Sequence, residues 1–335
     1  MIQSLARAFK EQKQSPSQSQ HRQDATSSDA SSTTPPTGVP VLSPPALSPD
    51  SRQNKITVCG MELEGISISG QETSIIFPRA KVAFDIGRCP QRACFQQTVL
   101  LSHTHLDHVG GLPFHVCTRE MLSLPASRVV VPQGCGAGVR RLVDVARELQ
   151  NSPPLDFEVL ELQGGEDHVL TSGYLCRCFP TTHTIASQGY LLYSQRRKLK
   201  AELLGKSQEE IRELRLAGED VTDTISVPEI AFTGDTTAEF LDVRSNPTLE
   251  DALKARVLIM EMTFICDNVT VDEAREKGHM HIADFVAHAH RFQNEAIVLI
   301  HFSPRYKRTD IITALNTMLP PSLKAKCIPL LNGIE

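Results

Sequence analysis

From about Val58 onward the chain alternates short apolar runs with polar turns, and two periodicities are visible in the runs. Continuous or alternating apolar residues predict strands at 98–101, 129–131, 174–179, 230–232 and 296–300. Apolar residues at helical spacing predict helices near 139–146 and 282–289. Strands that alternate with helices indicate a mixed α/β architecture.

Residues 1–54 lack such runs and are rich in Ser, Thr, Pro and Gln. Apolar side chains are too sparse there to repay the entropy of ordering, so a disordered extension is expected, followed by one catalytic domain at 55–335. Ile2, Leu5 and Phe9 share one face of a short amphipathic pattern typical of transit peptides, although Glu11 weakens that reading. We therefore expect the cytoplasm or nucleus, with a plastid or mitochondrion as the alternative, and no membrane span.

Composition adds two limits. Nine cysteines occur without a Cys-x-x-Cys pair, which predicts free thiols in a reducing compartment. The 335-residue chain has a net charge of -5 and therefore no overall basic footprint for nucleic acid. Any affinity for RNA must come from local patches.

The run 103–108 reads His-Thr-His-Leu-Asp-His and directly follows the apolar strand at 98–101. Imidazole and carboxylate groups together suit a divalent metal such as zinc. Surface histidines are the first alternative, and a closed structural zinc site, usually rich in cysteine, is the second. The run supplies four imidazole and carboxylate donors and no cysteine, which suits two open sites completed by further ligands better than one closed structural site, so two metal ions are expected.

Two ions need further ligands, and three candidates follow predicted strands. His183 comes after 174–179, Asp235 follows the strand that ends in the turn at Gly234, and His301 ends the run 296–300. Loops after neighbouring strands reach the same edge of a sheet, so we expect these side chains to meet the first cluster.

At this point the sequence resembles the metallo-β-lactamase superfamily and, within it, the short form of tRNase Z as found in plants. The matching segments are Phe84-Asp85-Ile86-Gly87-Arg88-Cys89, the run 103–108, Gly234-Asp235-Thr236 and His301-Phe302-Ser303-Pro304-Arg305-Tyr306. The resemblance runs from about Val58 to the C-terminus and implies a four-layer αβ/βα sandwich with a protruding arm.

The resemblance also implies roles for single residues. His103, His105 and His183 would hold the first of two zinc ions; Asp107, His108 and His301 would hold the second, and Asp235 would bridge both. The reaction would be attack of an activated water on a phosphodiester of precursor tRNA, which removes the 3′ trailer.

Further roles follow from the same resemblance. Asp107 would be the general base. Glu261 and His279 lie in loops that match the family's catalytic loops, and His279, oriented by Glu261, would protonate the leaving oxygen. Met260 and Met262 beside Glu261, and Met280 and His281 beside His279, depart from the usual pattern.

A basic stretch lies between His183 and Asp235, at the position where tRNase Z carries a tRNA-binding arm, here expected at about 190–228. Ser207 and Glu210 form a capping-box pattern before a short helix that stops at Gly218. Interspersed glutamates leave a plain solvated helix as the alternative, and the Gly-Pro motif of many such arms is missing. The resemblance makes precursor tRNA the partner and a homodimer the assembly, and the substrate-binding candidates are Arg196, Arg197, Lys198 and Arg305.

Rival functions remain. Another hydrolase of the same fold, such as a cyclic-nucleotide phosphodiesterase, would share the metal ligands without needing the arm, and a tRNA-binding subunit without catalysis would not need the complete ligand set. The stretch Gly134-Cys135-Gly136-Ala137-Gly138 lacks the third glycine of a dinucleotide fingerprint, so a simple strand-to-helix turn is favoured there.

Overall fold

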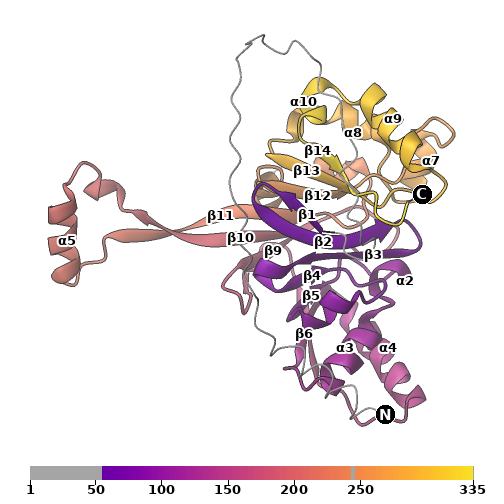
Figure 1. Ribbon diagram of the computed structural model, residues 1–335, viewed down its shortest axis with the longest axis horizontal. Helices are drawn as coiled ribbons and strands as arrows, with labels where there is room; N and C mark the ends of the chain where they lie inside the picture. The colour runs from indigo at the N-terminus through magenta and orange to yellow at the C-terminus, as the bar shows by residue number, and fades with distance from the viewer. Residues whose placement is uncertain (1–54, 243–245, 335) are drawn as a thin grey trace, which may run out of the picture. The chain divides into compact units, whose positions relative to one another are not determined.

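Two seven-stranded sheets form the centre of the protein in a computed structural model that describes residues 55–242 and 246–334 (Figure 1). The expectation for residues 1–54 lies outside the described residues. In each sheet the strands follow one another in chain order, and each sheet is antiparallel in one half and parallel in the other.

The first sheet contains β1 Lys55–Val58, β2 Met61–Ile68, β3 Glu72–Phe77, β4 Val82–Phe84, β5 Thr98–Leu100, β6 Ser127–Pro132 and β7 Phe157–Leu162. The second contains β8 His168–Val169, β9 Leu175–Pro180, β10 Gln188–Leu199, β11 Thr222–Phe232, β12 Val257–Glu261, β13 Ala296–Ile300 and β14 Cys327–Pro329. The strands expected at 98–101, 129–131, 174–179, 230–232 and 296–300 are confirmed. Every residue of β12 and β13 is buried, as the continuous apolar runs of parallel strands require.

Helices cover the outer face of each sheet. Beside the first sheet lie α2 Leu106–Val109, α3 Leu112–Met121 and α4 Gly136–Leu149, with the 3-10 turns η1 Pro78–Ala80 and η2 Gln91–Phe95. Beside the second lie α6 Pro247–Ala252, α7 Val271–Glu276, α8 Ile282–Ala287, α9 Arg308–Met318 and α10 Pro321–Lys324, with η4 Ala238–Asp242 and η5 Ala289–Arg291.

The core has three apolar layers. The middle layer joins the two sheets, and Phe84 of β4 stacks on Phe232 of β11 with ring centroids 4.9 Å apart. One outer layer packs α3 and α4 onto the first sheet, and the other packs the C-terminal helices onto the second. The order helix, sheet, sheet, helix confirms the four-layer sandwich.

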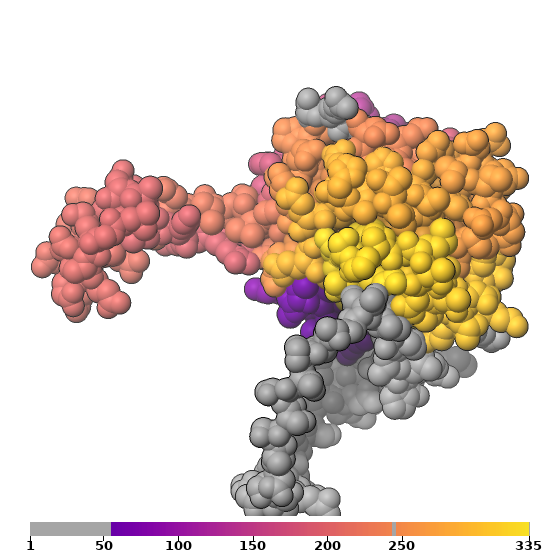
Figure 2. Space-filling model, turned by 90° about the horizontal axis from the view of Figure 1, so that it is seen from above, coloured from indigo at the N-terminus to yellow at the C-terminus, as the bar shows by residue number. Residues whose placement is uncertain are grey.

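An arm, defined here as residues 195–226, continues from the second sheet (Figures 1 and 2). β10 and β11 stay paired out to Leu199 and Thr222, where their side chains are mostly exposed. Beyond them come η3 Ala201–Leu203 and α5 Gln208–Leu216. The expected capping box is present, since the Ser207 side chain accepts from the Glu210 N–H and the Glu210 side chain accepts from the Ser207 N–H.

The glycine-rich stretch after β6 is a strand-to-helix turn into α4, as favoured from the sequence. The backbone N–H groups of Gly134 and Gly136 both donate to the Glu161 carboxylate, at 3.0 and 2.8 Å. Glu161 thus takes the donors that a phosphate would need. Within the described part of the chain, no helix has the length and apolar character of a membrane span.

Candidate metal centre

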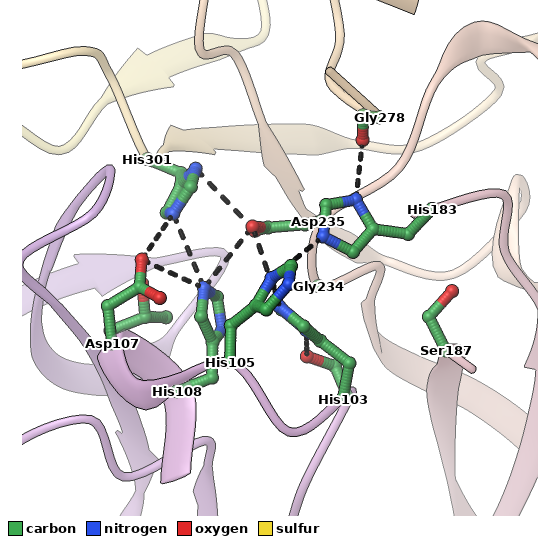
Figure 3. A network of polar contacts seen from close by, with 12 residues as sticks. His103, His105, Asp107, His108, His183, Ser187, Gly234, Asp235, Gly278 and His301 are labelled. Atoms are coloured by element: carbon green, nitrogen blue, oxygen red, sulfur yellow. Dashed lines mark hydrogen bonds and ion pairs between the residues drawn. The ribbon is translucent and has the colours of Figure 1, made fainter. Parts of the chain in front are cut away.

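The predicted ligands of the first ion meet at one edge of the two sheets (Figure 3). The loop after β5 carries His103 and His105, and the loop after β9 carries His183. The His105 Nδ1 atom lies 3.1 Å from the His103 Nε2 atom and 3.1 Å from the His183 Nε2 atom. Three imidazoles from both sheets therefore converge on one point.

The predicted ligands of the second ion form a neighbouring cluster. Asp107 and His108 come from α2, and His301 follows β13. The Asp107 Oδ2 atom lies 3.5 Å from the Nε2 atoms of both His108 and His301, and these two nitrogens are 3.3 Å apart. This cluster also draws on both sheets.

Asp235 lies between the clusters, in the loop after β11 (Figure 3). Its Oδ2 atom is 3.7 Å from the Nε2 atom of His103 in the first cluster and 3.3 Å from that of His108 in the second. Gly234 makes this position accessible, because it has a φ of 62° and a Cβ atom there would lie 2.3 Å from Ser102 Cβ. Asp235 thus lies between the two clusters, and its bridging of two ions stays a prediction.

The donor set fits divalent metal ions. Two nitrogen ligands on a tetrahedral zinc ion lie about 3.3 Å apart, since each zinc-nitrogen bond is about 2.0 Å. The separations of 3.1 Å in the first cluster and 3.3 to 3.5 Å in the second match that spacing. Each residue offers one ligand atom, and all atoms of a cluster lie within 4.8 Å of one another.

The protonation states of three candidate ligands also favour metal binding. Burial raises the pKa of Asp235, but the charges of His108 and His301 outweigh it and hold that pKa well below the ordinary range. For Asp107, hydrogen bonds from His108 and His301 likewise outweigh burial and lower the pKa. Burial beside His108 lowers the pKa of His103, which keeps that imidazole neutral. The carboxylates are therefore ionised, and His103 keeps a lone pair for a metal.

Asp85 orients His108, a role that the sequence did not reveal. Its fully buried carboxylate accepts hydrogen bonds from the Ser102 N–H, the Ser102 hydroxyl and the His108 Nδ1–H, each at 2.7 Å. Because the Asp85 carboxylate holds Nδ1, the Nε2 atom of His108 faces the cluster. The available signal was a carboxylate directly after the apolar strand β4.

His183 is oriented by a backbone carbonyl. Its Nδ1–H donates to the Gly278 oxygen at 2.7 Å, which turns Nε2 toward the first cluster. Only glycine fits at 278, because φ is 77° and a Cβ atom would approach the His183 Nδ1 atom to 2.5 Å. The loop that carries His279 therefore also positions a metal ligand.

Glu261 and His279 meet beside the metal clusters, as expected. The His279 Nδ1–H donates to Glu261 Oε1 at 3.1 Å and lies 3.8 Å from Asp235 Oδ2. Glu261 is fully buried and also accepts from the Thr236 N–H at 2.7 Å. Burial alone would lower the pKa of His279. The negative charges of the Glu261 and Asp235 carboxylates outweigh that effect and raise the pKa to about 9. His279 is thus held as a protonated acid at neutral pH.

Thr263 is a second residue whose role was missed. Its Oγ1 atom lies 2.5 Å from Glu261 Oε2 and 3.0 Å from the Nδ1 atom of His301, so it links Glu261 to a candidate metal ligand. The residues beside Glu261 and His279 that depart from the family pattern serve the fold. Met260, Met262 and Met280 are core residues, and His281 accepts from the Ala283 N–H to cap α8.

The arm candidates do not share one environment. Arg196 pairs with buried Glu229 at the base of the arm, where Glu229 also pairs with Arg256 at 3.3 Å. Arg197 and Lys198 are exposed and make no ion pair with any described residue. The sequence analysis grouped Arg196 with Arg197 and Lys198 as substrate-binding candidates, and the structure adds that Arg196 has a partner inside the protein.

Arg305 lies near the acid pair. Its guanidinium sits 5.5 Å over the Phe264 ring, and that ring contacts the His279 ring at a centroid distance of 6.0 Å. The Arg305 Nε–H also donates to the Ser303 hydroxyl at 3.0 Å. An exposed cation beside His279 is suitably placed to contact a phosphate.

Comparisons with known proteins agree with this geometry. A family described as the beta-lactamase superfamily domain matches residues 90–302. "tRNase Z TRZ1" of Arabidopsis thaliana is 44% identical over 282 residues, which cover 84% of this chain and 99% of that protein. "Nuclear ribonuclease Z" of Triticum aestivum is 44% identical over 172 residues, covering 51% of this chain and 97% of that protein. "tRNase Z TRZ2, chloroplastic" of Arabidopsis thaliana is 39% identical over 273 residues, covering 82% and 76%.

Solved structures support the fold. The short form of human tRNase Z superposes with a TM-score of 0.50 at 18% identity, covering 80% of this chain and 95% of that chain. The metallo-beta-lactamase fold protein YhfI from Bacillus subtilis also superposes with a TM-score of 0.50, at 14% identity and with the same coverage.

Proposed function

Because the chain belongs to the tRNase Z family of the metallo-β-lactamase superfamily, we propose that it removes 3′ trailers from precursor tRNA with two zinc ions in each subunit. The protein is an endoribonuclease of tRNA processing. The observation that carries the proposal is the convergence of seven ligand side chains on two clusters that share Asp235.

The two ions would divide the ligands as the clusters do. His103, His105 and His183 would hold one zinc ion, Asp107, His108 and His301 would hold the other, and Asp235 would serve both. The absence of cysteine from both clusters favours a catalytic over a structural zinc site, because structural sites are usually rich in thiolate. Bound zinc lowers the pKa of water and stabilises charge on phosphoryl oxygens.

The protein side chains would then handle the protons. Asp107, whose Oδ2 atom also accepts the Gly70 N–H at 2.8 Å, would take a proton from the attacking water. His279 would give its proton to the leaving 3′ oxygen, and the buried Glu261 carboxylate would keep His279 charged and oriented. Because the bond between the phosphorus and the 3′ oxygen breaks, the tRNA keeps a 3′-hydroxyl and the trailer keeps a 5′-phosphate.

The activity is tested with the purified full chain and two substrates. A precursor tRNA with a 3′ extension should be cut at one site to give those ends, with slower turnover of a chromogenic phosphodiester. Cleavage of the small diester without cleavage of the precursor would instead favour another hydrolase of this fold, such as a cyclic-nucleotide phosphodiesterase.

Arg197 and Lys198 are the arm cations we propose to contact the tRNA backbone. Replacing both by Ala should weaken precursor binding about tenfold to a hundredfold at about 0.1 M salt and lower the salt dependence of binding, since fewer counterions are released. Small phosphodiesters should be cleaved normally. Filter binding across a salt series measures the effect, and the matched control replaces Arg141 and Lys254, two exposed cations on the body. An unchanged salt slope would contradict the arm contact.

We also propose that the protein works as a homodimer in which the arm of one subunit holds the tRNA that the other cuts. The described residues of each chain form one arm and one candidate metal centre, and the arm points away from the body (Figure 2). A two-fold dimer is the economical way to bring an arm and a metal centre to one substrate.

A mixing experiment tests the dimer. One subunit loses residues 200–221, with Leu199 and Thr222 joined by Asn-Gly because these two residues are paired across β10 and β11. The other subunit carries Asp107→Ala. The mixture should regain cleavage that neither variant has alone, and no recovery after proven subunit exchange would show that each subunit works by itself.

For location we propose the cytoplasm or nucleus, with a plastid or mitochondrion as the alternative. All nine cysteines are free thiols, as a reducing compartment requires. Imaging of the full chain fused at its C-terminus to a fluorescent protein decides between them.

A further inference from the structure

Two cysteines lie side by side near α2, and none of the roles assigned above uses them. The sulfur atoms of Cys89 and Cys94 are 3.3 Å apart, within hydrogen-bond distance. Cys89 precedes the 3-10 turn η2 and Cys94 lies within it, so the turn brings the second sulfur back to the first. Both are thiols in this structure.

The two thiols differ in acidity. The hydrogen bond from the Cys89 thiol, aided by Thr118 and the Arg119 guanidinium, outweighs burial and lowers the pKa of Cys94 to about 7. The same hydrogen bond raises the pKa of Cys89. At neutral pH the pair therefore holds a thiolate beside a thiol, and the thiolate is the reactive form of cysteine. Cys94 is buried, but Cys89 is partly exposed and gives a small oxidant access to the pair.

We propose that Cys89 and Cys94 form a reversible disulfide when the protein meets a peroxide, and that this disulfide slows the enzyme. Disulfides in reducing compartments are usually transient and redox-sensing, so the pair agrees with the free thiols elsewhere in the chain. The formation of the disulfide does not depend on the proposed function, whereas its effect on precursor cleavage rests on it.

The chemistry needs only the two thiols and one peroxide. The thiolate attacks a peroxide oxygen, so an S–O bond forms, the O–O bond breaks, and hydroxide leaves and takes up a proton as water. The second sulfur then attacks the sulfenic acid, so the S–S bond forms, the S–O bond breaks and a second water leaves with the thiol proton. Two electrons pass from the two sulfurs to the peroxide. A dithiol reductant reverses the oxidation.

Cys94 is held in place from α3. The Arg119 guanidinium is buried and donates to the Cys94 carbonyl at 2.7 Å and to the Gln96 carbonyl at 2.8 Å. A disulfide bond is about 2.0 Å long, so sulfurs that are 3.3 Å apart have to approach each other by about 1 Å. Because Cys94 is anchored, Cys89 makes most of this movement.

The backbone around Cys89 is packed tightly against α2. A Cβ atom at Gly87 would lie 1.8 Å from the Asp107 carbonyl oxygen, and one at Gly111 would lie 2.6 Å from the Cys89 nitrogen. No free space separates these backbone segments, so a shift of Cys89 also moves α2. That helix carries Asp107 and His108, two candidate metal ligands.

The test treats the purified full chain with a stoichiometric amount of hydrogen peroxide and removes the excess with catalase. Trypsin cuts after Arg92, between the two cysteines, so mass spectrometry should find their two peptides linked with the loss of two hydrogens. Precursor cleavage should fall about tenfold, because a misplacement of about 1 Å can cost up to about a hundredfold in rate. Dithiothreitol should separate the peptides and restore the rate.

Two variants make the effect specific. Cys89→Ser removes one sulfur but keeps a hydrogen-bond donor beside Cys94, and it should cut the precursor equally fast before and after peroxide. Cys117→Ser is the matched control, since Cys117 is a partly buried thiol on α3 that contacts the Gln150 side chain. This control should form the disulfide and slow down as the wild type does.

Unlinked Cys89 and Cys94 in the peroxide-treated wild type would overturn the proposal. An unchanged cleavage rate in a chain shown to be linked would overturn it as well, and neither result depends on a variant that folds. If the reduced protein cuts no precursor, the proposed function itself fails, whereas the peptide map still decides whether the disulfide forms.

Discussion

Replacing Asp235 by Ala should strip metal from both clusters and lower precursor cleavage by at least about a thousandfold, since a bound ion contributes several kcal/mol to charge stabilisation in the transition state. Among residues 55–242 and 246–334, Asp235 is the one carboxylate whose Oδ2 atom approaches histidines of both clusters, at 3.7 and 3.3 Å. Without this carboxylate, the positive charges of two neighbouring ions would repel each other with no shared ligand between them, which is why metal should be lost from both clusters. Metal analysis by mass spectrometry and a cleavage assay on the same preparation measure both effects.

Two further variants make the Asp235 result specific. Asp235→Asn keeps the shape but removes the charge, and it should retain the fold with reduced metal content. Asp242→Ala removes an exposed carboxylate on η4 and should change neither metal content nor cleavage. Two bound ions and normal turnover in Asp235→Ala would refute the bridging assignment.

His279→Ala should separate chemistry from binding. Turnover should fall by about a hundredfold to ten-thousandfold, the usual contribution of a general acid, while tRNA affinity stays the same. His279 donates to Glu261 at 3.1 Å and does not belong to the two clusters assigned to zinc, so metal content should also persist. Single-turnover cleavage and filter binding give the two quantities.

The pH profile of His279→Ala adds an independent readout. The two carboxylates raise the pKa of His279 to about 9, so the proton is present at neutral pH and is lost as the pH rises through that value. The wild-type rate should therefore fall on the alkaline side, and the variant should lack that fall. His290→Ala, at an exposed position on η5, is the control. A large drop in tRNA affinity in His279→Ala would contradict the assignment to chemistry.

The convergence of the candidate ligands could be predicted from the sequence because each follows an apolar strand. His301 follows the five buried residues of β13, and Asp235 follows the buried end of β11. Parallel pairing of β11, β12 and β13 then brings the following loops to one edge. Local sequence patterns were sufficient to predict this meeting, because the direction of each strand determines at which edge of the sheet the following loop lies.

Roles that depend on contacts between distant loops were not readable. Asp85 acts through Ser102 and His108, and Thr263 acts through His301, which lies 38 residues away. Nothing in the local pattern around Asp85 or Thr263 names these partners. The outer parts of β10 and β11 were also missed, because their mostly exposed side chains show no alternation of burial. The pairing of Arg196 with Glu229 was not readable either, because the two residues lie 33 positions apart.

Each ligand cluster takes side chains from loops of both sheets: α2 and the loop before it follow β5, while His183 and His301 follow β9 and β13. An ion that binds only this assembled arrangement shifts the folding equilibrium by mass action, by about 2.7 kcal/mol for one site at a free concentration a hundred times its dissociation constant. Each bound ion would therefore act as a cross-link between the N-terminal and C-terminal halves of the chain. The supply of metal would then set the stability of the folded chain, as well as whether the enzyme can react.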